Sequence, residues 1–538
     1  MPLPKPFPQL DLANEDSNPG IRLFGRRFYT DQTIMELLAE FLLVANSGKQ
    51  IGKNNDLETF HSMLPARDQL TNWQSGQALG YKAPIRLNLK LFAFLGASKL
   101  ETRHDSHKQQ YKNILRRLKD AILTDGTIDK DDILKSLENL FLGFQGVGIN
   151  RTWCTQVFLP ISDALLARET NWQQTQAERA SVTQWADTHQ FFSSTQKLFM
   201  ARGGELLYLQ ICNALRQNGP VLNKFLANMD LSDEEKDPVQ LHAALENNLK
   251  NLTNGVPPAL DAIASLIDKI DAAANLNNND EPIWCAWCPE ESWREGYLFA
   301  VEVNRLCQAV IDPVDRIELL MIGCALQVLR SLCAQSVRYA PYTDANKSHA
   351  SVLEYAMIIS TPDGRDKNKK HLSQRNLQII LRTIHQALRD SDISANAQNG
   401  SKSRESLYRE ADTRYGHKLF LSLAKKIGLI VPQRGPGARL IFNDKILRYL
   451  VLTLIRPGER RTYDDFKMSL FEHHGMAIEG IEIEQASAWA EFPKIDTGAA
   501  VQTTWLADML KASGFLIHLS DACSLVHNPF DLDKGCKS

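Results

Sequence analysis

Apolar residues recur every three or four positions along most of this chain, and this spacing constrains the fold more than any other feature. In residues 30–45 (TDQTIMELLAEFLLVA), for example, Leu38, Phe41 and Leu42 share one helical face. Such a face is buried against other helices in a globular protein. We therefore expect a mainly α-helical fold.

The length of the chain allows several structural units. With 538 residues, of which 43% are hydrophobic, three or four units of ordinary domain size are expected. We predict a multi-helical N-terminal body followed by two small winged-helix-like α+β units. The predicted regions are a flexible arm (1–20), a helical body (21–271), a helical middle region (284–360), a basic winged-helix-like unit (373–460) and an acidic second winged-helix-like unit (461–538).

The cellular setting follows from three features of composition. The formal net charge is −2, and the nine cysteines are scattered, mostly within helical apolar patterns, which is typical of proteins in a reducing compartment. The proline-rich start, MPLPKPFPQLDL, lacks the apolar stretch of a signal peptide, and we find no apolar run near the length that spans a membrane. We expect a cytoplasmic protein that does not enter a membrane.

One segment of the N-terminal half has the pattern of a strand. Residues 86–95 (RLNLKLFAFL) alternate polar and apolar residues over their first half. This period of two predicts a half-buried β-strand.

The stretch KKIGLIVPQRGPGARLIFND (425–444) is the most informative part of the C-terminal region. It follows a polar linker (394–403) and a predicted helix (416–427), and Gly428 stands where a helix end favours positive φ. Two apolar runs then flank a basic Gly-Pro-Gly turn. A P-loop would need a Lys-Ser or Lys-Thr pair leading into a helix, so the remaining interpretations are the wing of a winged helix and an ordinary surface hairpin.

Charge favours the wing. Residues 400–461 contain fourteen basic and five acidic residues, a local net charge of +9, which suits contact with DNA phosphates. Arg434 and Arg439 flank the turn and are expected to meet phosphates, whereas side chains of the preceding helix would reach the groove with little base-reading chemistry. The candidate DNA-binding residues are Lys418, Ser422, Lys425, Lys426, Arg434, Arg439, Arg460 and Arg461.

The end of the chain repeats the same order of helix, glycine, apolar run, short turn, apolar run and asparagine. The spacing from Gly428 to Asn443 differs by one residue from that between Gly514 and Asn528. Residues 462–538 carry five basic and twelve acidic residues, a net charge of −7. We expect DNA to repel this second unit, which would dock against protein instead.

Other chemistry-bearing patterns favour structural roles. Cys285 and Cys288 form a CxxC pair, but no strand is predicted before them and no second ligand pair follows. His518 and His527 have no recognised zinc spacing, and His104 and His107 lie on a predicted solvated helix face. We therefore expect no metal, no cofactor and no catalytic residue.

Three segments carry a family resemblance. LFGRRFYTDQTIMELLAEFLLVANS (23–47), GINRTWCTQVFLP (148–160) and RGPGARLIFNDKILRYLV (434–451) resemble uncharacterised proteins encoded in bacterial anti-phage defence islands, in particular components of the methylation-associated defence system. The resemblance implies a role beside a methyltransferase, nuclease or ATPase encoded elsewhere.

These observations lead to one favoured hypothesis and two alternatives. The favoured one is a non-catalytic DNA-binding and scaffolding subunit of a bacterial defence complex, whose partners are duplex DNA and other defence-system proteins. One alternative is a metal-dependent nuclease with dispersed carboxylates. The other is a protein-only scaffold in which oppositely charged ends support a homo-oligomer.

Overall fold

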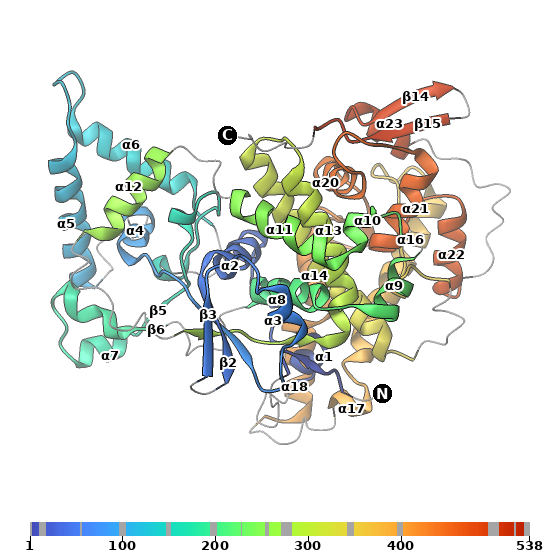
Figure 1. The fold of residues 1–538 in the computed structure, drawn as a ribbon, viewed down its shortest axis with the longest axis horizontal. Coiled ribbons are helices and arrows are strands. Elements are labelled where there is room, and N and C mark those ends of the chain that lie inside the picture. Colours follow the sequence, from blue (N-terminus) through green and yellow to red (C-terminus); the bar gives the residue numbers. More distant parts are fainter. Residues whose placement is uncertain are drawn as a thin grey trace.

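The computed structural model confirms a mainly α-helical protein (Figure 1). It describes residues 3–9, 18–53, 56–95, 104–146, 152–193, 202–227, 229–252, 258–270, 282–341, 349–394, 402–492, 505–520 and 523–531. The linker expected at 394–403 and the segment around Gly148 lie mostly outside these residues.

The helices fall into two groups along the chain. Those of the N-terminal and central part are α1 (Pro19–Phe24), α2 (Ile34–Asn46), α3 (Arg67–Thr71), α4 (Leu87–Lys90), α5 (Asp105–Ala121), α6 (Lys130–Gly143), α7 (Gln174–Arg179), α8 (Gly203–Leu215), α9 (Gly219–Leu226), α10 (Asp233–Lys236), α11 (Pro238–Leu252), α12 (Pro258–Lys269), α13 (Trp293–Gln308) and α14 (Pro313–Tyr339). Those of the C-terminal part are α16 (Lys367–Ala387), α17 (Ser391–Ser394), α18 (Arg404–Glu410), α19 (His417–Lys426), α20 (Asp444–Leu454), α21 (Tyr463–His474), α22 (Ile481–Trp489) and α23 (Trp505–Ala512).

The strands are short and form small separate sheets. The largest has the order β3-β2-β4-β7, from β2 (Gly48–Lys53), β3 (Asp56–Phe60), β4 (Ala78–Lys82) and β7 (Ile283–Trp284). A three-stranded sheet has the order β12-β15-β14, from β12 (Arg460–Thr462), β14 (Leu516–Ser520) and β15 (Cys523–His527). The remaining pairs are β1 (Pro6–Phe7) with β8 (Cys288–Pro289), β5 (Asn171–Trp172) with β6 (Phe192–Ser193), β9 (Met357–Ile358) with β13 (Met476–Ala477), and β10 (Ile430–Val431) with β11 (Arg439–Leu440).

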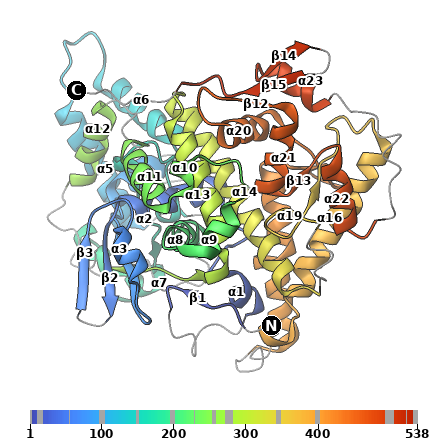
Figure 2. The same cartoon turned by 45° about the vertical axis from the view of Figure 1, so that its right-hand side comes forward.

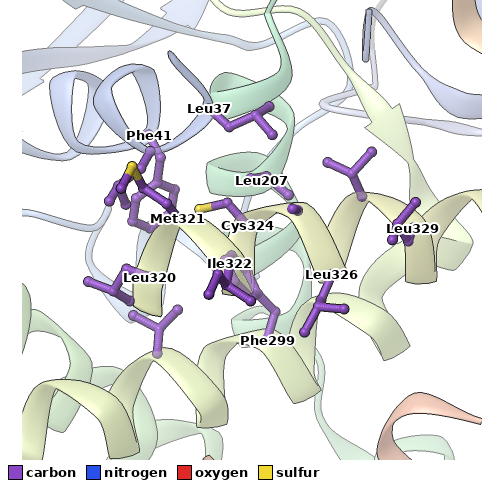
Figure 3. Packing of buried hydrophobic residues seen from close by; sticks show 14 of the residues in the cluster. Leu37, Phe41, Leu207, Phe299, Leu320, Met321, Ile322, Cys324, Leu326 and Leu329 are labelled. Carbon is purple, nitrogen blue, oxygen red and sulfur yellow. The ribbon is translucent and has the colours of Figure 1, made fainter. Parts of the chain in front are cut away.

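Helix α14 is the centre of the hydrophobic core. Leu320, Cys324 and Leu329 of this helix pack among side chains of α2, α8 and α13, including Phe41 and Phe299 (Figure 3). Its length and composition would allow it to cross a membrane, but 94% of its most apolar window is buried inside the fold. Burying each large apolar side chain contributes about 1.5–3 kcal/mol, so α14 acts as a core helix around which the other layers assemble.

The outer parts of the molecule lie on opposite sides of this core. Figures 1 and 2 show α5, α6 and α12 on one side and the C-terminal helices α16, α21 and α22 on the other. The helices α16, α21 and α22 are therefore separated from α5, α6 and α12 by the central helices.

A buried charged network joins the C-terminal region to the core. Glu302 of α13 pairs with Arg330 of α14 and also contacts His474 of α21, at 3.2 Å. The Tyr449 hydroxyl of α20 donates to the same carboxylate, at 2.9 Å. Burial alone would raise the pKa of Glu302, but Arg330 and His474 outweigh it and hold that pKa well below its usual range.

This network predicts that the fold weakens in mild acid. Burial lowers the pKa of His474 to about 4, whereas a histidine in the unfolded chain titrates near pH 6.5. Between these values the unfolded state binds a proton that the folded state does not, so each such histidine makes stability fall by about 1.4 kcal/mol per pH unit as the pH drops. Urea midpoints measured from pH 7.5 to pH 4.5 check this, and a midpoint that stays constant below pH 6.5 contradicts it.

Two C-terminal segments share part of the geometry that the predicted repeat requires. Gly428 and Gly514 both have φ of +78° at the end of a helix, and each is followed by a hairpin. The amide of Ile441 donates to the carbonyl of Leu429 in the first unit, as His527 donates to Phe515 in the second. In the second unit β15 also pairs with β12, whereas in the first the amide of Ser360 donates to the carbonyl of Leu440 in β11.

The predicted strand at 86–95 is wrong. Residues 87–90 form α4 and residues 91–95 form a π-helical turn. Lys90 is fully buried, and its ammonium donates to the carbonyls of Cys154 and Arg168. Polar and apolar residues are both buried here. The alternation of polar and apolar residues therefore does not indicate one exposed face and one buried face.

Part of the predicted flexible arm is also ordered. Pro6 and Phe7 pair with Pro289 and Cys288, and the Phe7 ring is buried beside Trp73, with 5.3 Å between ring centroids. The expectation of a loose arm is therefore wrong for these residues, because one buried aromatic side chain anchors the segment.

Candidate nucleic-acid interface

Helix α19 and the hairpin after it fold as their sequence indicates. Leu419, Phe420 and Leu423 lie on the buried face of α19. The helix ends at Gly428, and the Asn443 side-chain amide closes the unit by donating to the carbonyl of Ile427, at 2.8 Å. A β-carbon at position 428 would lie 2.4 Å from that amide nitrogen, so the position requires glycine both for its φ and for its space.

The Gly-Pro-Gly turn projects Arg434 into solvent. Gly435 and Gly437 have φ of +90° and +85°, a region that only glycine enters readily. Two side-chain amides hold the turn, because Gln433 donates to the carbonyl of Lys425 at 2.6 Å and Gln374 of α16 donates to that of Gly437 at 3.0 Å. The tip is thus fixed between α19 and α16, and no described atom lies within 4 Å of a β-carbon at Gly435.

The first turns of α16 extend the basic surface of this hairpin. The Arg439 guanidinium donates to the carbonyl of Pro362 at 3.0 Å and lies against Gly364, which the Lys370 side chain also approaches. We define the basic hairpin surface by its cationic side chains: Arg365, Lys367, Lys370, Lys425, Arg434 and Arg439. They come from two stretches, 365–370 and 425–439, that are far apart in the sequence.

Acidic residues reduce this positive charge only in part. Asp363 pairs with Arg365 at 3.0 Å, and the Asp366 side chain caps α16 by accepting from the amide of Lys369. The Lys369 side chain turns inward, where burial lowers its pKa, whereas Lys367 is exposed. The surface therefore keeps an excess of cations facing solvent, which suits an anionic polymer.

The predicted groove-contacting residues of α19 separate into two groups. Lys418, Ser422 and Lys425 form a stripe at spacings of four and three residues, with Lys418 exposed and the other two half-buried. Lys426 instead donates to the backbone carbonyls of Thr30 and Gln32, at 3.4 and 3.3 Å. We therefore assign Lys426 a structural role in fixing the basic unit to the N-terminal body.

Arg460 and Arg461 lie away from the first hairpin, on strand β12 of the second unit. Arg460 is exposed and is opposite His527 in the sheet. Arg461 pairs with Asp230 at 3.2 Å and with Glu459 at 3.3 Å, so its charge is compensated within the fold. Strand β12 thus adds at most Arg460 to a DNA-contacting set.

The cysteine and histidine motifs have structural surroundings. The predicted solvated face is wrong for His107, whose ring is buried against aromatic side chains that include Trp153 and Trp172. Cys285 and Cys288 are buried, and burial raises the pKa of both thiols, which opposes thiolate chemistry. His518 contacts Ser524 and His527 contacts the carbonyl of Gly514, so each ring has its own neighbour. Within the described ranges, no group of three or more His, Cys, Asp or Glu side chains could hold a metal ion.

Comparison with known proteins gives no relative of this chain. No family model, no curated protein and no solved structure matches it.

Proposed function

We propose that this chain is a non-catalytic DNA-binding and scaffolding subunit of a bacterial anti-phage defence complex, acting in the cytoplasm. The first C-terminal unit contacts duplex DNA, and the second contacts protein partners. The link to defence rests on the sequence resemblance of residues 23–47, 148–160 and 434–451.

The observation that carries DNA binding is the basic hairpin surface. A rigid turn presents Arg434, and Gln374 holds this turn against α16, whose first turns carry Lys367 and Lys370. Arginine and lysine at a fixed spacing contact successive phosphates without reading the sequence. The proposed binding is therefore strongly salt-dependent and weakly sequence-specific.

The order of elements supports a winged-helix interpretation of both units. In the second, the order is α20, β12, α21, β13, α22, α23, β14 and β15, with β15 in the middle of the sheet. In the first, one backbone hydrogen bond joins Ser360 to Leu440 of β11. In such a unit, one helix enters the major groove while the hairpin touches the flanking backbone. Lys418, Ser422 and Lys425 are on the corresponding helix, α19.

The opposite charge of the two units favours the scaffolding role. The second unit carries the acidic net charge of residues 462–538, and Asp464, Glu484 and Asp508 are exposed on it. Like charge would repel DNA, whereas a basic protein surface would be attracted. A second copy of this chain offers such a surface, so head-to-tail association is the alternative use of the same charges.

Charge reversal on the basic hairpin surface tests this function. The variant Lys367→Glu/Lys370→Glu/Arg434→Glu is expected to lose about 100-fold or more in affinity for duplex DNA at low salt, because three phosphate contacts become repulsive. Fluorescence anisotropy with a labelled duplex of arbitrary sequence measures the effect.

The matched control reverses three exposed charges elsewhere. The variant Lys112→Glu/Arg117→Glu/Lys135→Glu on α5 and α6 changes the net charge equally but should bind within about threefold of the wild type, because contacts and not net charge set the affinity. Equal losses in the two variants would refute the assigned surface. Unchanged affinity in the first variant would do the same.

A further inference from the structure

A cavity lined by arginines lies between the end of α14 and the last turns of α16. It has a volume of about 640 Å³ and is lined by Arg338 and Tyr339 on one side and by Arg382, Gln386 and Arg389 on the other. Cavities that hold small ligands in proteins are commonly of this size. It involves none of the residues of the basic hairpin surface.

Two of the arginines are held in place by carboxylates outside the cavity lining. Arg338 pairs with Glu295 at 2.9 Å, and its guanidinium also donates to Gln335. Arg389 makes a two-pronged contact with Asp412, at 3.0 and 2.7 Å. Fixed guanidinium groups lose little conformational freedom when a ligand binds.

Arg382 has no such structural explanation. Arginines at a helix C-terminus offset the helix dipole, and this accounts for Arg338 and Arg389. Arg382 lies more than a turn inside α16, is exposed, and has no ion-pair partner among the described residues. It shares a helical face with Gln386 and Arg389, so its guanidinium faces the same opening.

The charge and shape of the lining define the ligand class. Glu295 and Asp412 already compensate Arg338 and Arg389, so Arg382 supplies the uncompensated cation of the lining. Burial and the nearby Arg389 lower the pKa of His385. Planar guanidinium forks match the oxygens of a phosphate group.

We propose that this cavity binds a small phosphate-bearing ligand of the size of a nucleoside monophosphate, with Arg382 as its main phosphate contact. The site is independent of the proposed DNA interface. The cavity would bind a small molecule, whereas the basic hairpin surface is proposed to bind DNA.

Calorimetric titration with three probes tests the site. The full-length protein is titrated with AMP, inorganic phosphate and adenosine. We expect AMP to bind, phosphate to bind more weakly, and adenosine to show no binding. The variant Arg382→Ala should weaken AMP binding about 10-fold or more, as expected for a lost charge-assisted hydrogen bond. The control Lys112→Ala, at an exposed position of α5 outside both surfaces, should leave AMP binding unchanged.

Each remaining outcome overturns the proposal. These outcomes are an absence of AMP binding up to millimolar concentrations, adenosine binding as tightly as AMP, or an Arg382→Ala variant that binds like the wild type while its thermal unfolding shows it is folded. Loss of AMP binding in a Lys367→Ala variant would place the phosphate on the basic hairpin surface and would also refute the cavity. Because Arg382 is exposed, its replacement is not expected to disturb folding.

Discussion

Replacing Arg330 by methionine is expected to lower the free energy of unfolding by about 3–5 kcal/mol. Arg330 and Glu302 are both buried, with side-chain exposures of 1% and 0%. Without the guanidinium, the Glu302 carboxylate either stays charged without a cation or takes up a proton at a cost. Urea unfolding followed by tryptophan fluorescence would show the loss as a lower midpoint.

An exposed ion pair provides the control for this result. Lys445 pairs with Glu318 at 2.7 Å, but the two side chains are 67% and 43% exposed. Replacing Lys445 by methionine should change stability by less than about 1 kcal/mol, because water screens the pair. If Arg330→Met were as mild as Lys445→Met, the network would not join the C-terminal region to the core as described.

The second large effect is expected where α8 and α13 cross. A β-carbon at Gly296 of α13 would lie 2.2 Å from the carbonyl oxygen of Gln210 in α8. Backbone cannot move aside as a flexible side chain can, so Gly296→Val must separate the two helices. We expect a loss of about 3 kcal/mol or more, measured by the same urea unfolding.

Gly143 is the matched position for this substitution. It is the last residue of α6, and a β-carbon there would meet no described atom within 4 Å. Gly143→Ala should leave the free energy of unfolding unchanged or raise it by up to about 1 kcal/mol, because alanine favours a helix more than glycine does. A Gly296→Val protein as stable as Gly143→Ala would contradict the close packing of α8 on α13.

The helical parts of the fold could be predicted because their signals are local. Helix α19 lies within the predicted 416–427, and Gly428 has the positive φ that its position suggested. Residues 86–95 could not be predicted from their pattern, because the buried ammonium of Lys90 is satisfied by carbonyls more than sixty residues away. Such long-range hydrogen bonds leave no mark on the local pattern of hydrophobicity.

In the candidate interface, too, some features could be predicted from the local sequence and others depend on contacts formed by folding. The glycine and proline residues around Arg434 are sufficient to predict an exposed basic hairpin from the sequence. The involvement of Lys426 with Thr30 and of Arg461 with Asp230 depends on segments brought together only by folding. The basic stretch 365–370 was visible in the sequence, but its position beside the hairpin is fixed by Gln374 and Arg439.

The most direct measurement for the proposed function is the affinity of the wild-type protein for duplex DNA across a series of salt concentrations. If four or five cations of the basic hairpin surface contact phosphates, log K should fall linearly with log salt with a slope of about −4. Binding that is absent at low salt, or that does not change with salt, would contradict the account of this surface as a DNA interface.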